Sequence, residues 1–245
     1  MVAPSVTPTV ETMSSASGNG SQRLNKAFCI PREELEDRLH VSLDGRQNGG
    51  YHAIVPLREI VSIDDISVFK VEVLNALVRN IPLRSPEGIV YPYADARIQQ
   101  FRTEPGGLYV GQTFVLDAKV LSIMHNLRGC FESHCMPGLS KMGPVQVYGV
   151  TKSGDRAIAI YVPPIVEKHG DHSVILDGIH RSYICRSGGT TITAIHVSNV
   201  GAPLPFDPIQ WSSVNMVHAK PPIEERYVNL RRELFRDLTT VGIDG

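Results

Sequence analysis

The stretch VILDGIHRSYICRSGGTTITAIHV, residues Val174–Val197, contains the pattern that decides the fold. It opens with an apolar run typical of a buried strand, and this run ends at Asp177. Gly178 follows, and the next residues are expected to form a short helix that a pair of glycines ends. The segment TTITAIHV, residues 190–197, is rich in β-branched residues and predicts a further strand. The sequence therefore predicts a strand–turn–helix–strand unit with polar residues at its turn.

The turn of this unit combines groups that suit a bound phosphate. Backbone N–H groups at the start of a helix are unpaired, and together with the helix dipole they favour an anion. Arg181 offers a planar fork of donors, and His180 can donate to a phosphate or transfer a proton near neutral pH. Gly178 lets a ligand approach the backbone, and Asp177 can hold a metal ion, orient His180 or act on a hydroxyl. An ordinary Asp-Gly turn is the competing interpretation.

The flanking sequence predicts further strands and helices. VQVYGV (Val145–Val150) and AIAIYV (Ala157–Val162) flank the turn TKSGD and are typical of a hairpin. Apolar residues at helical spacing predict a helix at about Asp65–Arg79. Pro31 and early acidic residues fit a helix at Ile30–Val41, and a helix is favoured from Asp117 onward, where the pattern is mixed.

The clearest amphipathic helix is expected at Pro221–Leu238. Pro222 fits its start, and Glu224 and Glu225 fit its first turn. Arginines lie opposite its apolar stripe, a pattern that suits either a solvated face or a contact in a homodimer.

Composition restricts the class of protein. The chain has 245 residues, of which 42% are hydrophobic and 20% charged, enough for one generous domain with a real core. A formal net charge of −1 argues against a strongly basic platform for nucleic acid. No apolar run approaches the roughly 20 residues that span a bilayer. We therefore expect a cytoplasmic protein with no membrane segment and no nucleic-acid partner.

Cysteine usage agrees with a reducing compartment, because the four cysteines are scattered. His125, Cys130, His134 and Cys135 lie within eleven residues and could ligate zinc. The adjacent pair rarely reaches one ion, so this metal site is a minor hypothesis.

Two further features of the sequence favour structural roles. The cluster EKHGDH, Glu167–His172, falls in the loop before the signature turn and is expected to be a solvated turn, with a role beside a nucleotide as the alternative. Trp211 is the only tryptophan, and packing is favoured over a place in a pocket.

The segment from Pro163 to Val197 resembles the core of the ParB/sulfiredoxin superfamily. In that family sulfiredoxins carry Gly-Cys-His-Arg at the turn and free serine kinases carry Asp-Gly-His-His-Arg. The sequence here, Asp177-Gly178-Ile179-His180-Arg181, is closest to the kinase form, with isoleucine in place of the first histidine. IVPLREI, Ile54–Ile60, resembles the opening strand of the family. The likeness covers about a fifth of the chain and leaves residues 84–144 without a counterpart.

The resemblance implies an α+β fold, with a small mixed sheet, flanking helices and a large insertion. On this division, residues 26–200 form the ParB/sulfiredoxin-like domain, with the insertion at about 84–144. Residues 1–25 are rich in Ser, Thr, Pro and Gly and are expected to be a disordered tail. Residues 201–245 form an extension with one amphipathic helix.

The resemblance also implies a nucleotide site. The histidine and arginine of the family's turn contact nucleotide phosphates, usually with magnesium. Carried over, Gly178, His180, Arg181 and Ser182 bind the nucleotide, Asp177 and His180 take catalytic roles, and Asp177 also holds Mg²⁺.

The leading function is phosphoryl transfer from ATP or ADP to a small hydroxylated acceptor, such as an amino acid. Glu59, which follows the family-like strand, is preferred to Glu72 as the base. The alternative is a binding module regulated by CTP or ATP with little turnover, and a third possibility is a scaffold that has lost the ligand. Ile179 replaces the cysteine that sulfiredoxins need, and only about fifty residues follow Val197, so a reductase and a DNA reader are disfavoured.

Overall fold

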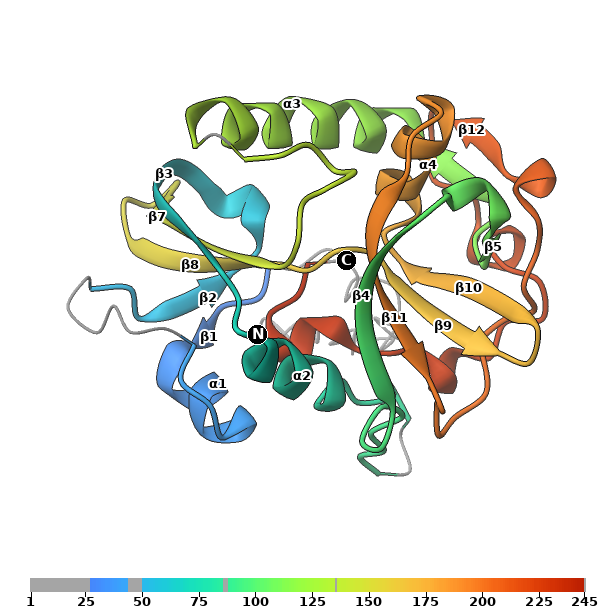
Figure 1. The fold of residues 1–245 in the computed structure, drawn as a ribbon, viewed down its shortest axis with the longest axis horizontal. Helices are drawn as coiled ribbons and strands as arrows, with labels where there is room; N and C mark the ends of the chain where they lie inside the picture. Colours follow the sequence, from blue (N-terminus) through green and yellow to red (C-terminus); the bar gives the residue numbers. More distant parts are fainter. Residues whose placement is uncertain (1–26, 44–49, 86–87, 135, 245) are drawn as a thin grey trace, which may run out of the picture.

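The structure is a computed structural model that describes residues 27–43, 50–85, 88–134 and 136–244. The predicted tail at residues 1–25 therefore lies outside the described residues. Two five-stranded sheets lie next to each other, with α3 (Asp117–Ser133) along one side and α1 (Arg32–Leu39) and α2 (Val71–Arg79) on the opposite side (Figure 1). This mixture of helices and sheets confirms the α+β class. Across the described ranges, no helix is both long and apolar enough to cross a bilayer.

The first sheet has the strand order β1–β2–β8–β7–β3. Its β2 and β8 run parallel, and its other neighbours are antiparallel. The predicted hairpin is confirmed as β7 and β8. The strands of this sheet are β1 (Ile30–Pro31), β2 (Ala53–Val55), β3 (Ile60–Val68), β7 (Val145–Thr151) and β8 (Arg156–Tyr161).

The second sheet, in the order β4–β11–β9–β10–β5, contains the predicted strand–turn–helix–strand unit. That unit is β10, α4 (Ile179–Ser187) and β11, as the sequence predicts. Two strands come from the expected insertion at residues 84–144, so this segment is part of the sheet framework. The strands of this sheet are β4 (Arg97–Thr103), β5 (Tyr109–Val110), β9 (Ile165–His169), β10 (His172–Asp177) and β11 (Ile192–Ser198).

One small mixed sheet was expected, and the two larger sheets correct this expectation. The chain leaves the first sheet after β8 and enters the second at β9, through Val162, Pro163 and Pro164. Proline has no N–H for a sheet ladder, so consecutive prolines separate the two sheets. A separate parallel pair joins β6 (Phe114–Leu116) to β12 (Asn215–Val217).

The main core lies where the inner faces of both sheets meet α1 and α2. Leu35, Leu77, Ile158 and Ile195 are fully buried there. A second cluster lies between the second sheet and α4 and includes Trp211. The Trp211 indole N–H donates to the carbonyl of Pro105 at 2.7 Å, which agrees with the packing interpretation.

The helix predicted at about Asp65–Arg79 begins later, because its first residues belong to β3. Ile60–Val68 pairs with β7 and is hydrogen-bonded along that strand, and α2 begins only at Val71. Short apolar runs fit a strand or a helix, and here the partner strand decides between them.

The α-helix predicted at Pro221–Leu238 is wrong. The described chain forms only short 3₁₀ turns there, at Ile223–Glu225 and Arg232–Leu234, with another at Leu238–Val241. Tyr227, Val228 and Arg236 instead make isolated β-bridges to other parts of the chain. Tertiary contacts therefore outweigh helical propensity, and the homodimer contact expected on this helix loses its basis.

A buried ion pair holds this C-terminal segment against the second sheet. Glu167 is completely buried, and Arg236 donates to its two carboxylate oxygens at 2.7 and 2.9 Å. Tyr93 donates its hydroxyl to the same carboxylate, and His169 lies 2.6 Å from it. The solvated turn expected at Glu167–His172 is therefore wrong for Glu167.

We predict that Glu167→Gln destabilises the protein by about 3–5 kcal/mol, because it leaves the Arg236 charge buried without a partner. Urea unfolding followed by circular dichroism measures this change. The control is Glu34→Gln, which removes an exposed pair with Arg38 and should cost less than about 1 kcal/mol. Equal effects of the two substitutions would contradict the structural role, whereas Arg236→Met added to Glu167→Gln should recover part of the loss.

Candidate functional site

Gly178 sets the geometry of the turn between β10 and α4. Its φ of +85° lies in the left-handed region that glycine tolerates best. A Cβ at this position would lie 2.7 Å from the Cγ of Pro164 and 3.0 Å from Nη2 of Arg181. Glycine is therefore required here by backbone conformation and by the close approach of its neighbours.

Arg181 is engaged inside the protein. Only 9% of the residue is exposed, and Nη2 donates to Oδ2 of Asp177 at 2.6 Å. Its Nη1 donates to the carbonyl of Val162 at 2.6 Å, and the guanidinium lies 5.3 Å from the Tyr161 ring centroid. Because Val162 belongs to the connection between the sheets, Arg181 ties the end of the first sheet to the second.

His180 is also buried and already has a hydrogen-bond partner. The Leu116 N–H, at the start of α3, donates to its Nε2 at 3.1 Å. Burial first, and then the charges of Lys119, Arg181 and Lys220, lower the pKa of His180 to about 3. The ring is therefore neutral at physiological pH and acts as an acceptor.

Ser182 is completely buried on α4, and its hydroxyl has no hydrogen-bond partner among the described residues. Its backbone N–H donates to the Gly178 carbonyl at 2.9 Å. The structure thus brings together all the residues that the sequence analysis placed at the turn, and it buries most of them.

Two exposed lysines that sequence reasoning missed, Lys119 and Lys220, lie close enough to His180 to lower its pKa. Burial by surrounding protein atoms lowers the pKa of Lys119. The negative charge of Asp177 raises this pKa, and the positive charge of Arg181 lowers it further. Crowding also lowers the pKa of Lys220, with the charges of Arg226 and Lys119 adding to it. No motif marks these lysines, because they come from α3 and from the C-terminal segment.

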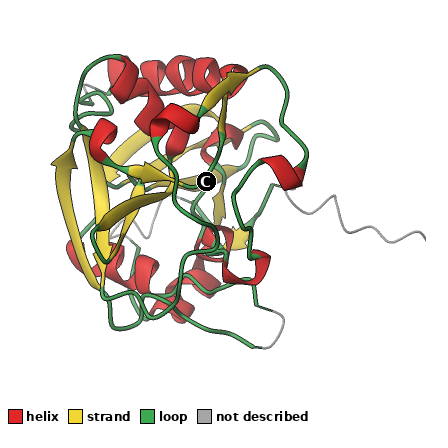
Figure 2. Cartoon of the chain, turned by 90° about the vertical axis from the view of Figure 1, so that its right-hand side faces the viewer, coloured by secondary structure: helices red, strands yellow, loops and turns green. Residues whose placement is uncertain are grey.

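Glu59 lies at the end of the 3₁₀ turn Leu57–Glu59, in the first sheet's half of the molecule. Its carboxylate is 3.9 Å from Nε of Arg58 and 3.8 Å from Nζ of Lys152. Arg58 also pairs with Asp244 at 2.6 Å, and the charge of Asp244 acts on both Lys119 and Arg181. Figures 1 and 2 both place the C-terminal end near the middle of the molecule. Glu59 is therefore linked to the turn through neighbouring charges, with no direct contact to Asp177 among the described interactions.

The described residues contain no group of three or more His, Cys, Asp or Glu side chains arranged for a metal ion. Asp177 has one carboxylate oxygen bound by Arg181. Cys135 and the side chain of Cys130 lie outside the described part of the chain, so zinc binding with His125 and His134 stays a prediction.

Fold and site together define an α+β protein with a buried polar turn at the start of α4 and exposed lysines around it. Comparison with protein-family models, curated proteins and solved structures gave no match. The resemblance to the ParB/sulfiredoxin superfamily thus rests on the residues of the turn and its flanking strands.

We predict that acid weakens the fold through His180. Its pKa is lower in the folded protein than its ordinary value of about 6.5, so the unfolded chain takes up the proton first as pH falls. This contribution to stability is complete above about pH 6.5 and is lost toward pH 3, with an upper limit of about 5 kcal/mol. His196, whose pKa burial lowers to about 4, acts in the same direction.

Urea unfolding at several pH values, with wild type and His180→Gln, measures this effect. The glutamine oxygen can still accept from Leu116 but does not titrate, so the variant should lose less stability between pH 6.5 and 4. The control is His52→Gln, at an exposed position. An identical pH dependence of wild type and His180→Gln would show that His180 does not cause the acid sensitivity.

Proposed function

We propose that this protein binds a nucleotide through its phosphates at the α4 cation cluster, defined as Lys119, His180, Arg181 and Lys220. The observation that carries the proposal is the convergence of these residues at the start of α4. Burial is the main cause of the lowered pKa values of His180 and both lysines, and neighbouring positive charges add to it for His180 and Lys220. Around Lys119, the charges of Asp177 and Asp244 oppose those of Arg181 and Arg58. A polyanion relieves the repulsion between the positive charges, and a helix start adds its own preference for negative charge.

The residues of the cluster have different roles in this proposal. Lys119 and Lys220 are exposed and can reach an anion in solvent. Arg181 is buried and holds Asp177 and Val162, so its charge contributes to the local potential while it keeps the turn in place. The side chains that touch phosphate in this proposal are therefore the lysines.

Mg²⁺ fits this arrangement only as a companion of the nucleotide. Magnesium commonly uses one or two carboxylates together with substrate phosphates. Asp177 offers one carboxylate oxygen beyond its bond to Arg181, so phosphate oxygens and water would supply the other ligands.

In the enzymatic form of the proposal, ATP or ADP donates its terminal phosphoryl group to a small hydroxylated acceptor, such as an amino acid. The acceptor oxygen attacks the terminal phosphorus, Glu59 takes the hydroxyl proton, and the shortened nucleotide leaves. Positioning and charge stabilisation supply most of the catalysis in such reactions. Arg58 pairs with both Glu59 and Asp244, and the charge of Asp244 acts on Lys119, which supports this form. A cytoplasmic location would supply the nucleotide.

The alternative form is a binding module regulated by a nucleotide, including CTP, with little turnover. Asp177 is paired with Arg181, and His180 already accepts a hydrogen bond from Leu116. Because these hydrogen bonds already occupy both groups, neither is placed to transfer a proton to or from a ligand. This arrangement favours nucleotide binding without catalysis.

We predict that Lys119→Gln and Lys220→Gln together weaken nucleotide binding at least tenfold, because each removes a charge-assisted contact. Titration calorimetry with ATP, ADP and CTP, each with Mg²⁺, measures the affinity. Both lysines are exposed, so the variant should stay folded, unlike one that removes the buried Arg181. Rising salt should also weaken binding of the wild type.

The matched control is Lys141→Gln, at an exposed lysine outside the cluster. Binding that the cluster variant and Lys141→Gln retain equally, or no binding of any of the three nucleotides, would remove this proposal. Release of inorganic phosphate, or phosphoryl transfer to serine as a test acceptor, separates the enzymatic form from the regulatory one. In the enzymatic form, Glu59→Gln should abolish turnover and leave affinity unchanged.

A further inference from the structure

A cavity of about 350 Å³ opens on the second sheet, away from the α4 cation cluster. Side chains from four neighbouring strands line it, together with Leu108. Its size is that of a small-molecule site. The lining residues used below are Gln99, Phe101 and Thr103 of β4, Lys168 of β9, Ser173 of β10 and His196 of β11.

Two stacked rings form the wall of this cavity. Phe101 and His196 come from adjacent antiparallel strands, and their ring centroids are 3.8 Å apart with an interplanar angle of 17°. Phe101 nevertheless stays 45% exposed. A large aromatic ring exposed beside a cavity offers a flat apolar surface on which another planar ring can stack.

His196 leaves a polar atom unsatisfied at the same place. Its Nε2 is buried and has no hydrogen-bond partner among the described residues. Burial lowers the pKa of His196 to about 4, so the ring is neutral at physiological pH. A buried polar atom without a partner is costly, and a ligand with a hydrogen-bonding ring nitrogen or amine would remove that cost.

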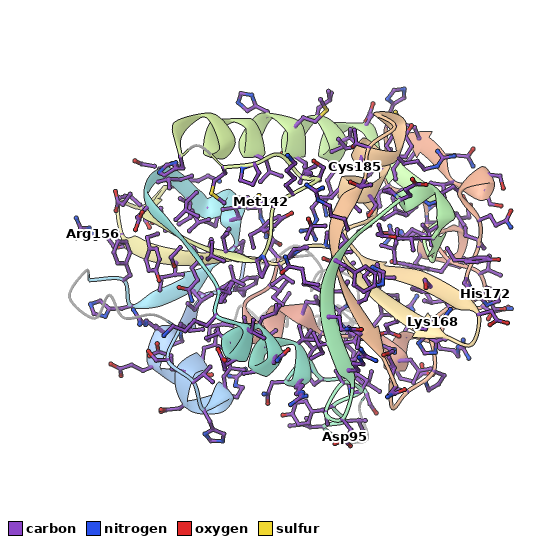
Figure 3. All side chains as sticks on the ribbon, in the orientation of Figure 1. Asp95, Met142, Arg156, Lys168, His172 and Cys185 are labelled. Atoms are coloured by element: carbon purple, nitrogen blue, oxygen red, sulfur yellow. The ribbon has the colours of Figure 1, made fainter. Side chains whose placement is uncertain are left out.

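Most of the other lining residues are polar, and one of them carries a positive charge. Gln99, Thr103 and Ser173 offer amide and hydroxyl groups, and the exposed Lys168 offers an ammonium group. Figure 3 places Lys168 beside the β9–β10 hairpin and Cys185 on α4, in a different part of the molecule. Ser173 and Asp177 are also four residues apart on β10, about 13 Å along a strand. The cavity is thus separate from the α4 cation cluster.

We propose that this cavity binds a planar heteroaromatic compound that carries an anionic group. The ring stacks on Phe101, a ring nitrogen or amine pairs with His196, and the anionic group pairs with Lys168. A nucleoside monophosphate and a heteroaromatic carboxylate share this chemistry. The proposal does not depend on nucleotide binding at the α4 cation cluster.

Titration calorimetry with four probes tests the cavity. Adenosine 5′-monophosphate and nicotinate each combine a heteroaromatic ring with an anionic group, adenosine has the ring alone, and ribose 5-phosphate has the phosphate alone. We expect at least one of the first two to bind more tightly than adenosine and ribose 5-phosphate. Binding by adenosine 5′-monophosphate alone identifies the nucleotide source, and binding by nicotinate alone identifies the carboxylate source.

Variants assign the binding to the cavity. Phe101→Ala should weaken it about 5- to 100-fold, in line with the loss of one stacked ring. Lys168→Gln should weaken the anionic probes and leave adenosine unchanged. The controls are Lys70→Gln and Val61→Ala, at exposed positions outside the cavity. Phe101→Ala and Lys168→Gln leave the α4 cation cluster unchanged, so the binding that they weaken belongs to the cavity. The proposal is overturned if neither anionic probe binds or if Phe101→Ala binds them as the wild type does.

Discussion

The buried guanidinium of Arg181 is the contact on which the arrangement of the two sheets depends. It bonds the Asp177 carboxylate at the end of β10 and the Val162 carbonyl at the end of the first sheet. A buried arginine is tolerated when its charge is paired and its N–H groups have acceptors, and both conditions are met here. The turn at Gly178 follows from the same contact, because Pro164 and Arg181 leave no space for a Cβ. The main structural role of the DGIHR sequence is therefore to connect the two sheets.

A second buried ion pair, between Glu167 and Arg236, fixes the C-terminal segment to the second sheet, as Arg181 connects the two sheets. In place of the predicted amphipathic helix, the segment follows a path whose backbone makes isolated bridges to Leu83, Gln112 and Asp207. Removing one partner of such a pair leaves a buried charge, which makes each pair a constraint on the fold. In the proposed function, the exposed Lys119 and Lys220 meet the ligand and these buried charges hold the structure.

The two proposed sites use the second sheet differently. The α4 cation cluster lies where β10 ends, and it relies on positive charge from three separate parts of the chain. The cavity by Phe101 and His196 lies on the sheet itself and relies on a flat ring and an unsatisfied nitrogen. Charge attracts a polyanion over several ångströms, whereas stacking and a single hydrogen bond require contact and shape. The chemistry of the two ligands is therefore expected to differ.

Local pattern was enough to predict the α+β class, the β7–β8 hairpin, α3 from Asp117, and the β10–α4–β11 unit, because each depends on periodicity and turn residues within a short window. Burial of Arg181 and Glu167 was not predictable in this way, since each finds partners contributed by distant segments. The same reason explains the missing helix near Arg236, whose tertiary pairing outweighs a helical pattern. Dependence on distant segments is also the reason why the sequence does not predict the roles of Lys119, Lys220 and the Phe101–His196 stack. No sequence spacing marks them, and only the pairing of strands and the packing of helix starts brings them together.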